Sequence, residues 1–191
     1  MIDVNLVDGQ ILAVRAALLI EGWMTPDELA WLAYSAHCHK SILEIGSWLG
    51  RSTMALAMAT EGHVTCVDTW AGSHEKAHQE FLAGKHEGWL AEKFLENTQS
   101  LTNLTAIRDL SLQFANRNLV RPTYDMIFLD ASHDRESVAA EIRAFTPLLM
   151  PGGLLCGHDY NWPSVAEAVN ELIPNVQRGV GSIWWAPLDV A

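Results

Sequence analysis

Residues 44–53 read Glu-Ile-Gly-Ser-Trp-Leu-Gly-Arg-Ser-Thr, a buried strand that ends in a glycine turn and leads into a helix. The strand begins at Ser41, and the helix is expected over residues 51–60. Gly46 and Gly50 allow tight turning and a close approach of the backbone. Their spacing, Gly-x-x-x-Gly, differs from the dinucleotide fingerprint Gly-x-Gly-x-x-Gly, which disfavours NAD as the ligand.

Strand-like and helix-like segments alternate on both sides of this turn, a pattern typical of an α/β fold with a mainly parallel sheet. Further strands are expected at 63–68, 105–107, 124–130, 154–157, 176–178 and 182–186. A helix is expected after Thr25-Pro26-Asp27-Glu28, which forms a capping box, and others near 136–146 and 165–172. Gly179-Val180-Gly181 favours an antiparallel hairpin for the last pair of strands, and Pro151-Gly152-Gly153 predicts a turn. We therefore predict about seven strands with helices on both faces.

The composition excludes several classes of function. The chain has 191 residues, with 12 Lys and Arg against 23 Asp and Glu, a net charge of −11. A phosphate backbone or an anionic membrane would be repelled, so we expect no nucleic-acid or membrane partner. The apolar runs are shorter than the roughly 20 residues that span a bilayer. No basic leader precedes the first strand, and three distant cysteines are typical of reduced thiols, so we expect a cytoplasmic protein.

Nearly every expected strand ends in a carboxylate, at Glu44, Asp68, Asp109, Asp130 and Asp159. Ligands of doubly wound sheets bind outside the carboxyl ends of the strands, and unpaired buried charge is costly in a core. The acids therefore indicate a cationic or polyhydroxylated ligand, or a metal. Asp68 follows the glycine turn by about 20 residues, where an acid can accept both hydrogen bonds of a ribose diol.

Five segments carry a family resemblance: residues 44–53, 67–70, 128–133, 151–153 and 156–160. They read Glu-Ile-Gly-Ser-Trp-Leu-Gly-Arg-Ser-Thr, Val-Asp-Thr-Trp, Phe-Leu-Asp-Ala-Ser-His, Pro-Gly-Gly and Cys-Gly-His-Asp-Tyr. The sequence resembles class I S-adenosylmethionine-dependent methyltransferases, and within them the small type 24 group, from about Gly22 to Trp184. This implies one domain over residues 1–191, a Rossmann-like three-layer sandwich whose seven-stranded, mostly parallel sheet has one antiparallel strand, with residues 1–40 as an N-terminal helical extension.

The resemblance implies an S-adenosylmethionine site at the first three strand ends. The expected cofactor-binding residues are Glu44, Gly46, Ser47, Asp68, Thr69, Asp109, Leu110, Ser111 and Asp130. Asp68 would hold the ribose hydroxyls, and residues 109–111 would border the adenine. Acids suit the sulfonium cation, which becomes a neutral thioether as the methyl group leaves. The alternative for Glu44 and Asp68 is that they face solvent, and for Asp109 and Ser111 that they cap a helix.

The acceptor side is expected at the fourth and fifth strand ends. An alcohol has a pKa far above 7, so its attack requires a base or a metal. We expect Asp130 and His133 to be catalytic, with His133 as the general base; the alternative for His133 is a structural partner of Asp130. The resemblance to metal-dependent O-methyltransferases implies Mg²⁺ or Mn²⁺ at Asp130, Asp159 and His158. An imidazole ligand favours Mn²⁺ over Mg²⁺.

Four other features suggest roles outside the chemistry. Residues 73–98 are long and polar, and we expect a helical lid over the acceptor. His74 and His78 could form a zinc pair on one helical turn or a solvated face, and their sequence favours the latter. Trp48 and Trp70 could cover the cofactor or the acceptor. Eight tryptophans and the apolar run Ile11–Ile20 suggest a homodimer surface.

We expect an S-adenosylmethionine-dependent methyltransferase that acts on a hydroxyl of a sugar or another small molecule, with or without a metal. Two alternatives stay open at this point. A metal-dependent hydrolase or hydroxylase would use Asp130, His133, His158 and Asp159 and would not bind S-adenosylmethionine. A catalytically silent module would bind S-adenosylmethionine without transferring its methyl group.

Overall fold

The central sheet brings together seven strands that are distant in the sequence. The structure, a computed structural model, describes residues 7–118 and 123–188. The strands are β1 (Ser41–Ile45), β2 (His63–Asp68), β3 (Leu104–Arg108), β4 (Tyr124–Leu129), β5 (Leu149–Gly157), β6 (Gln177–Arg178) and β7 (Trp184–Leu188). Their order is β3-β2-β1-β4-β5-β7-β6, and β7 runs antiparallel to both of its neighbours. This confirms the predicted seven-stranded, mostly parallel sheet with one antiparallel strand.

The central strands are apolar on both faces because helices cover both faces. Ile42 of β1 and Phe128 of β4 point into one core, whereas Leu43 and Ile127 of the same strands point into the other. All four side chains are fully buried. Because β1, β2, β4 and β5 run parallel, their carboxyl ends lie at one edge of the sheet. The acids that follow these strands are brought together there.

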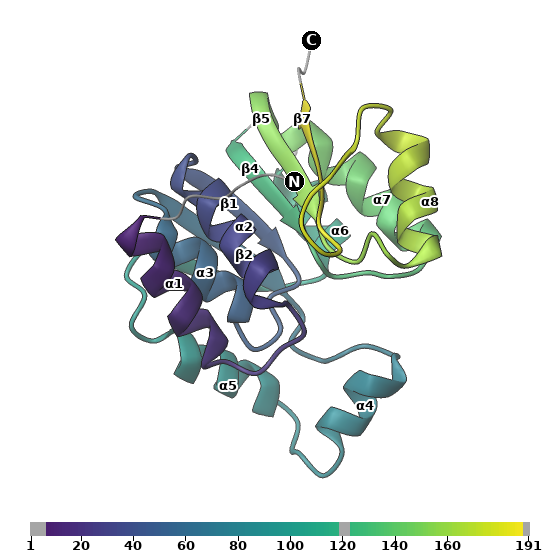
Figure 1. Cartoon of the computed structure of the whole chain (residues 1–191). Helices are drawn as coiled ribbons and strands as arrows, with labels where there is room; N and C mark the ends of the chain where they lie inside the picture. Colours follow the sequence, from purple (N-terminus) through teal and green to yellow (C-terminus); the bar gives the residue numbers. More distant parts are fainter. Residues whose placement is uncertain (1–6, 119–122, 189–191) are drawn as a thin grey trace.

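Helices form the two outer layers of the sandwich (Figure 1). One layer contains α1 (Asp8–Leu18), α2 (Pro26–His37), α3 (Arg51–Ala59) and α5 (Trp89–Thr98). The other contains α6 (Ser111–Asn118), α7 (Arg135–Phe145) and α8 (Pro163–Leu172). The helix α4 (Lys76–Leu82) extends away from the body of the domain, and a single 3-10 turn, η1 (Thr146–Leu148), precedes β5. None of the helices in the described ranges has the length and apolar character needed to cross a membrane.

The predicted capping box is present at the start of α2. The side chain of Thr25 accepts a hydrogen bond from the Glu28 backbone N–H, and the Glu28 carboxylate accepts one from the Thr25 backbone N–H. Pro26 occupies the first helical turn. The helix therefore begins where these residues satisfy its free backbone N–H groups.

Two segments differ from the sequence prediction. The predicted turn at residues 151–153 lies inside β5, because the strand begins at Leu149 and includes Gly152 with a φ of 75° at an irregularity in its pairing with β4. The expected helical stretch at 73–98 is divided into α4 and α5. Gly84 and Gly88 separate them, with φ values of 78° and 88°, in the left-handed region that an α-helix cannot contain.

Candidate active site

A cavity of about 440 Å³ opens at the carboxyl ends of the strands. It extends from the glycine turn after β1 to the loops after β4 and β5. Of the residues predicted to bind the cofactor or act in catalysis, those on its wall are Gly46, Ser47, Asp68, Thr69, Asp109, Leu110, Ser111, Asp130, His133, His158 and Asp159. All of the predicted site residues except Glu44 therefore line the same cavity.

The glycine turn is pressed against the end of β4. Gly46 has a φ of 87°, and a Cβ atom added to it would lie 2.2 Å from the backbone oxygen of Asp130. A side chain at this position would therefore collide with the neighbouring strand. Gly50, with a φ of 90°, precedes the first residue of α3. The turn thus holds the start of α3 beside the loop after β4.

Glu44 lies beneath this turn rather than on the cavity wall. It is fully buried, and its Oε2 accepts hydrogen bonds from the hydroxyls of Ser47 and Thr53. Burial raises the pKa of Glu44 to about 7, although hydrogen bonds from Ser52, Thr53 and Ser47 oppose this. Glu44 therefore supports the turn from the core side. The sequence pattern placed an acid at the end of the strand, but it could not show whether this acid lies in the core or on the cavity wall.

Asp68 fixes the shape of the turn from the end of β2. Its Oδ2 accepts hydrogen bonds from the backbone N–H groups of Ser47 (2.8 Å) and Trp48 (2.9 Å), and its Oδ1 accepts one from Trp70 (2.6 Å). Each carboxylate oxygen can accept more than one hydrogen bond. Asp68 is therefore oriented before any ligand binds and retains acceptor capacity toward the cavity.

The end of the cavity after β3 contains a buried acid that sequence reasoning missed. Glu141 of α7 is 3% exposed, and its Oε1 accepts hydrogen bonds from the hydroxyls of Ser111 (2.8 Å) and Ser132 (3.1 Å). Burial raises its pKa. The amphipathic pattern of α7 predicts that polar residues face solvent. It therefore gave no indication that Glu141 faces inward. Beside it, Asp109 contacts Arg117 and accepts a hydrogen bond from the Leu110 N–H.

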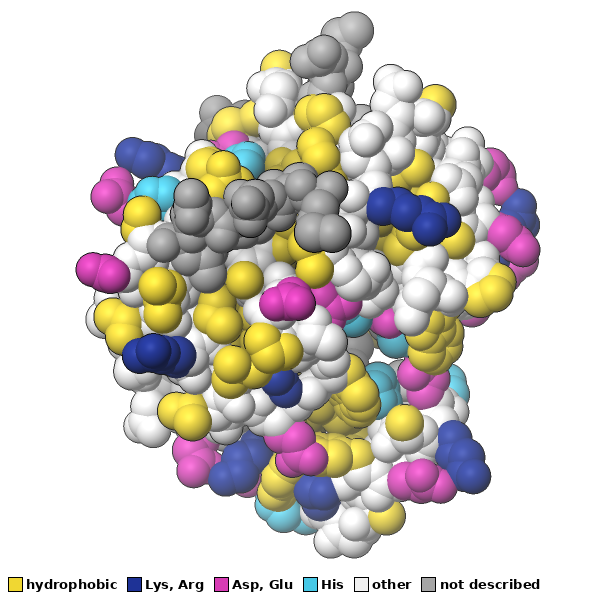
Figure 2. Space-filling model, viewed as in Figure 1, with side chains coloured by type: hydrophobic (Ala, Val, Ile, Leu, Met, Phe, Trp, Pro, Cys, Tyr) yellow, Lys and Arg dark blue, Asp and Glu magenta, His cyan; other side chains and the backbone are white. Residues whose placement is uncertain are grey.

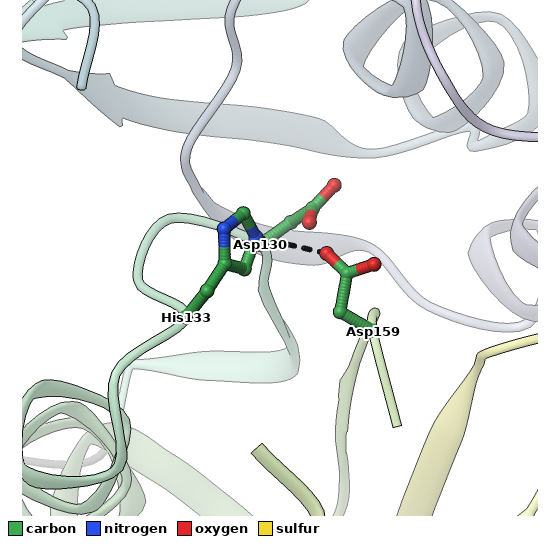
Figure 3. Close-up of side chains that lie close together, drawn as sticks. All are labelled: Asp130, His133 and Asp159. Carbon is green, nitrogen blue, oxygen red and sulfur yellow. Dashed lines mark ion pairs between the residues drawn. The ribbon is translucent and has the colours of Figure 1, made fainter. Parts of the chain in front are cut away.

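Asp130, His133 and Asp159 converge from the loops after β4 and β5 (Figure 3). The Nε2 atom of His133 lies 2.8 Å from Oδ2 of Asp159, and its Nδ1 contacts Glu75 of the segment before α4. Burial lowers the pKa of His133, but Asp159 and Glu75 outweigh it and raise that pKa to about 9. Burial raises the pKa of Asp130 to about 7, despite the opposing charges of His158 and His133.

His158 is held by a second buried acid that sequence reasoning treated only as a helix cap. Its Nε2 lies 3.1 Å from Oε1 of Glu28 and 3.0 Å from the Ser182 hydroxyl. Its Nδ1 lies 3.3 Å from Asp159 and 3.7 Å from Asp130. Burial lowers the pKa of His158, but the surrounding carboxylates outweigh it and raise that pKa to about 11. His158 thus bridges Glu28 and the carboxylates of the site.

The donor atoms of Asp130, His133 and Asp159 lie within 4.8 Å of one another, a spacing that fits one metal ion. The sequence prediction placed His158 in this set in place of His133. No described residues beyond these three form such a group. His74 and His78 do not share a helical turn, because His74 precedes α4, and the ring of His78 instead stacks on Trp48 with centroids 4.3 Å apart.

Aromatic side chains form the outer wall of the cavity. Trp23 and His78 have ring centroids 4.8 Å apart, and Trp23 and Trp48 have centroids 5.4 Å apart. Trp162 contacts the ring of His133 on the other side, at 4.8 Å. Trp70, which the sequence suggested could cover the cofactor or the acceptor, is buried against Phe94 and donates a hydrogen bond from Nε1 to the Trp48 carbonyl. It is absent from the residues described on the cavity wall.

Comparisons with known proteins agree with this geometry. A family model described as "Methyltransferase domain" matches residues 43–160. No curated protein matches the chain.

Three solved structures illustrate the likeness. Cofactor-bound Rv0187 from MTB is 18% identical, with a TM-score of 0.64 over 94% of this chain and 88% of that one. An O-methyltransferase from Bacillus cereus in complex with SAH is 18% identical, with a TM-score of 0.61 over 98% and 94%. CalS11, a TDP-rhamnose 3'-O-methyltransferase of calicheamicin biosynthesis, is 14% identical, with a TM-score of 0.54 over 83% and 76%. At these identities the likeness shows a shared fold.

Proposed function

The chain belongs to the type 24 group of class I S-adenosylmethionine-dependent methyltransferases, and we propose that it transfers the methyl group to a hydroxyl of a small molecule such as a sugar. The observation that carries this proposal is the single cavity that joins the glycine turn and Asp68 to Asp130, His133 and Asp159. The first part suits a nucleoside and the second suits a hydroxyl that must lose a proton.

The cavity wall fits S-adenosylmethionine by the chemistry of its donors and acceptors. The oriented carboxylate of Asp68 can accept the hydrogen bonds of a ribose diol. We place the adenine beside Asp109, Leu110 and Ser111, at the end where Ser111 is oriented by Glu141. S-adenosylmethionine supplies an electrophilic methyl group on a sulfonium cation, and the acidic wall is favourable to that positive charge.

The transfer needs alignment and the removal of one proton. The acceptor oxygen forms a bond to the methyl carbon while the bond between that carbon and sulfur breaks. The hydroxyl proton passes to Nε2 of His133, which faces the cavity next to Asp159. The ring is held on both sides, by Glu75 and Asp159, so it needs little reorganisation. Orientation of this kind can lower a barrier by roughly 7–11 kcal/mol.

A divalent cation such as Mg²⁺ or Mn²⁺ fits the same group of residues. Asp130 and Asp159 would hold it, with Nε2 of His133 within reach as a third ligand, and a bound cation would lower the pKa of the acceptor hydroxyl. A ring that binds a cation through Nε2 cannot take a proton there. Dependence on a cation and the role of His133 as the base are therefore alternatives, and we propose His133 as the base.

Calorimetry and turnover test the proposal. We expect S-adenosylhomocysteine to bind the wild-type protein and to bind Asp68→Asn at least tenfold more weakly, with Glu61→Gln, an exposed acid, as the matched control. Methyl transfer from labelled S-adenosylmethionine should then be measured on a panel of hydroxylated sugars and phenols, with EDTA and with added Mg²⁺ or Mn²⁺.

Each outcome separates the proposal from its rivals. Absence of S-adenosylhomocysteine binding would contradict the cofactor site and favour a hydrolase or hydroxylase. Binding without turnover on any member of the panel would favour a silent module. Complete loss of turnover in EDTA, restored by Mn²⁺, would overturn His133 as the base in favour of the cation.

A further inference from the structure

One end of the cavity is suited to recognise the acceptor, an assignment that rests on the function proposed above. We call it the acceptor end and define it by seven residues of the cavity wall: Glu21, Trp23, Trp48, Glu75, His78, Asp159 and Trp162. Figure 2 shows a notch between the α4 segment and the body of the domain, with hydrophobic, acidic and histidine side chains at its edges.

The aromatic rings of the acceptor end present faces to a ligand. Trp23 is 55% exposed and Trp162 is 41% exposed, although both rings already contact a neighbour on one side. An exposed aromatic ring at the mouth of a cavity stacks on flat rings and on the apolar face of a sugar, and it attracts a cation. The walls therefore favour a ring-shaped ligand over an extended chain.

The acceptor end, as defined by these residues, contains neither lysine nor arginine. Phosphate is bound by Lys, Arg or clusters of backbone N–H groups. No lysine lies among the described residues of the cavity wall. Its one arginine, Arg51, donates a hydrogen bond from Nη1 to the Gly22 carbonyl at 2.6 Å, and its buried Nε has no partner among the described residues. Lys85, on the connection between α4 and α5, lies over the rings of Phe81 and Trp89, and Lys76 of α4 pairs with Glu80.

Carboxylates face the same space. Glu21 and Glu75 lie on the wall and are outside the group of Asp130, His133 and Asp159, so a cation bound to that group would not neutralise them. Only Oε1 of Glu75 contacts His133, and Oε2 has no partner among the described residues. A positively charged substituent could therefore contact Glu75 while its ring lies against the tryptophans.

We propose that the acceptor is a hydroxylated ring that carries an amino group or no charge, and that phosphate-bearing acceptors such as nucleotide-linked sugars are excluded. This differs from what the fold alone would suggest, because the structurally similar CalS11 is described as acting on TDP-rhamnose, which carries a diphosphate. In the present chain Glu75 selects for the amine and Trp23 holds the ring.

Two matched series of probes test the charge preference on the protein loaded with S-adenosylhomocysteine. One series is glucosamine, glucose and glucose 6-phosphate; the other is dopamine, 4-methylcatechol and protocatechuate. Binding is followed by tryptophan fluorescence and confirmed by calorimetry. We expect the amine of at least one series to bind at least tenfold more tightly than its anionic member, with the neutral member between them.

Variants assign that preference to named side chains. Glu75→Gln should reduce the ratio of amine to anion affinity at least fivefold, whereas Glu80→Gln on the exposed side of α4 should leave it unchanged. Trp23→Ala should weaken all members of the binding series at least fivefold without changing the affinity for S-adenosylhomocysteine.

Three results would overturn the inference. The first is equal or tighter binding of the anions, and the second is no binding of any probe at 10 mM, about a thousandfold above a typical low-micromolar KM. The third is a ratio of amine to anion affinity in Glu75→Gln that equals the wild-type ratio. A protein that fails to bind S-adenosylhomocysteine would instead contradict the proposed function, so the two failures can be told apart.

Discussion

At the scale of single residues, His133 connects the geometry of the site to a pH dependence. Its pKa is raised to about 9, so at pH 7 the ring is protonated in most molecules. A base must be neutral, and the neutral fraction grows about tenfold per pH unit below the pKa. We therefore expect the kcat for methyl transfer in EDTA to rise with pH up to about 9 and to level off above it.

The pH–rate profile needs a control that removes the ring. His133→Ala should lower kcat by about 10²–10⁴-fold, the usual contribution of a general base. The residual kcat of His133→Ala should not rise toward pH 9, because the imidazole that titrates in the wild type is absent. A profile in His133→Ala that still rises toward pH 9 would assign the titration to another group.

The buried pair of Glu28 and His158 predicts a change in stability. Burial opposes ionisation of Glu28, but hydrogen bonds with His158, Ser182 and Thr25 outweigh it and lower its pKa. The pKa of His158 is raised to about 11. The contribution of Glu28 is present above its ordinary pKa and is lost as the pH falls through the lowered one. The contribution of His158 is present below about 6.5 and is lost as the pH rises through about 11.

Glu28→Gln should therefore destabilise the protein at pH 7 by about 3–5 kcal/mol, as expected when one partner of a buried ion pair is removed. Gln can keep the capping box with its one oxygen, but its NH2 group cannot accept the hydrogen bonds that Ser182 donates, so the change removes the charge together with these bonds. Urea unfolding measures the effect, and Glu136→Gln on the exposed face of α7 is the control. A difference below about 1 kcal/mol between the two variants would mean that the pair contributes little.

At the scale of elements, we expect α4 to open locally more readily than α3. It has no buried residues, and the left-handed Gly84 and Gly88 separate it from α5. Few buried apolar contacts mean a small free energy of local opening. Hydrogen exchange should therefore be faster at the amides of 79–82 than at those of α3, seven of whose nine residues are buried.

Ligands should slow this exchange, because Glu75 and His78 connect the segment to the cavity wall. The comparison is between free protein and protein with S-adenosylhomocysteine and a bound acceptor probe. Equal protection of α4 and α3 in the free protein would contradict the role of 73–98 as a lid, which stays a prediction until it is measured.

The elements also show what the sequence could and could not predict. The capping box of α2 and the strand β1 depend on neighbouring residues, so local patterns located them. The span of β5 was wrong, because Gly152 is tolerated in a strand whose irregular pairing with β4 is a tertiary feature. The strand-end acids were found from one rule of sheet topology. The roles of Glu28, Glu75 and Glu141 were missed, because each has a partner that is distant in the sequence: Ser182 is 154 residues from Glu28, His133 is 58 from Glu75 and Ser111 is 30 from Glu141.

At the scale of the whole molecule, the outer face of α1 predicts self-association. Ala13 and Ala17 are fully buried, whereas Leu12 is 56% exposed and Leu19 is 89% exposed. This face belongs to the apolar run that suggested a homodimer. We expect sedimentation velocity to show a dimer that Leu19→Glu shifts toward monomer, with Met150→Glu, on another exposed surface, as the control. A monomeric wild-type protein at 100 μM, well above a typical micromolar Kd, would contradict this prediction.

The contact between Glu28 and Ser182 also has a consequence for biosynthesis. The N–H and hydroxyl of Ser182, on the turn before β7, both donate to a carboxylate that was made 154 residues earlier, and His158 is oriented by the same pair. Because synthesis starts at the N-terminus, we expect Glu28 and the glycine turn to leave the ribosome well before Ser182 does. The contacts of Ser182 with Glu28 and His158 cannot form until the residues before β7 have emerged, so the orientation of the His158 imidazole is fixed late in synthesis.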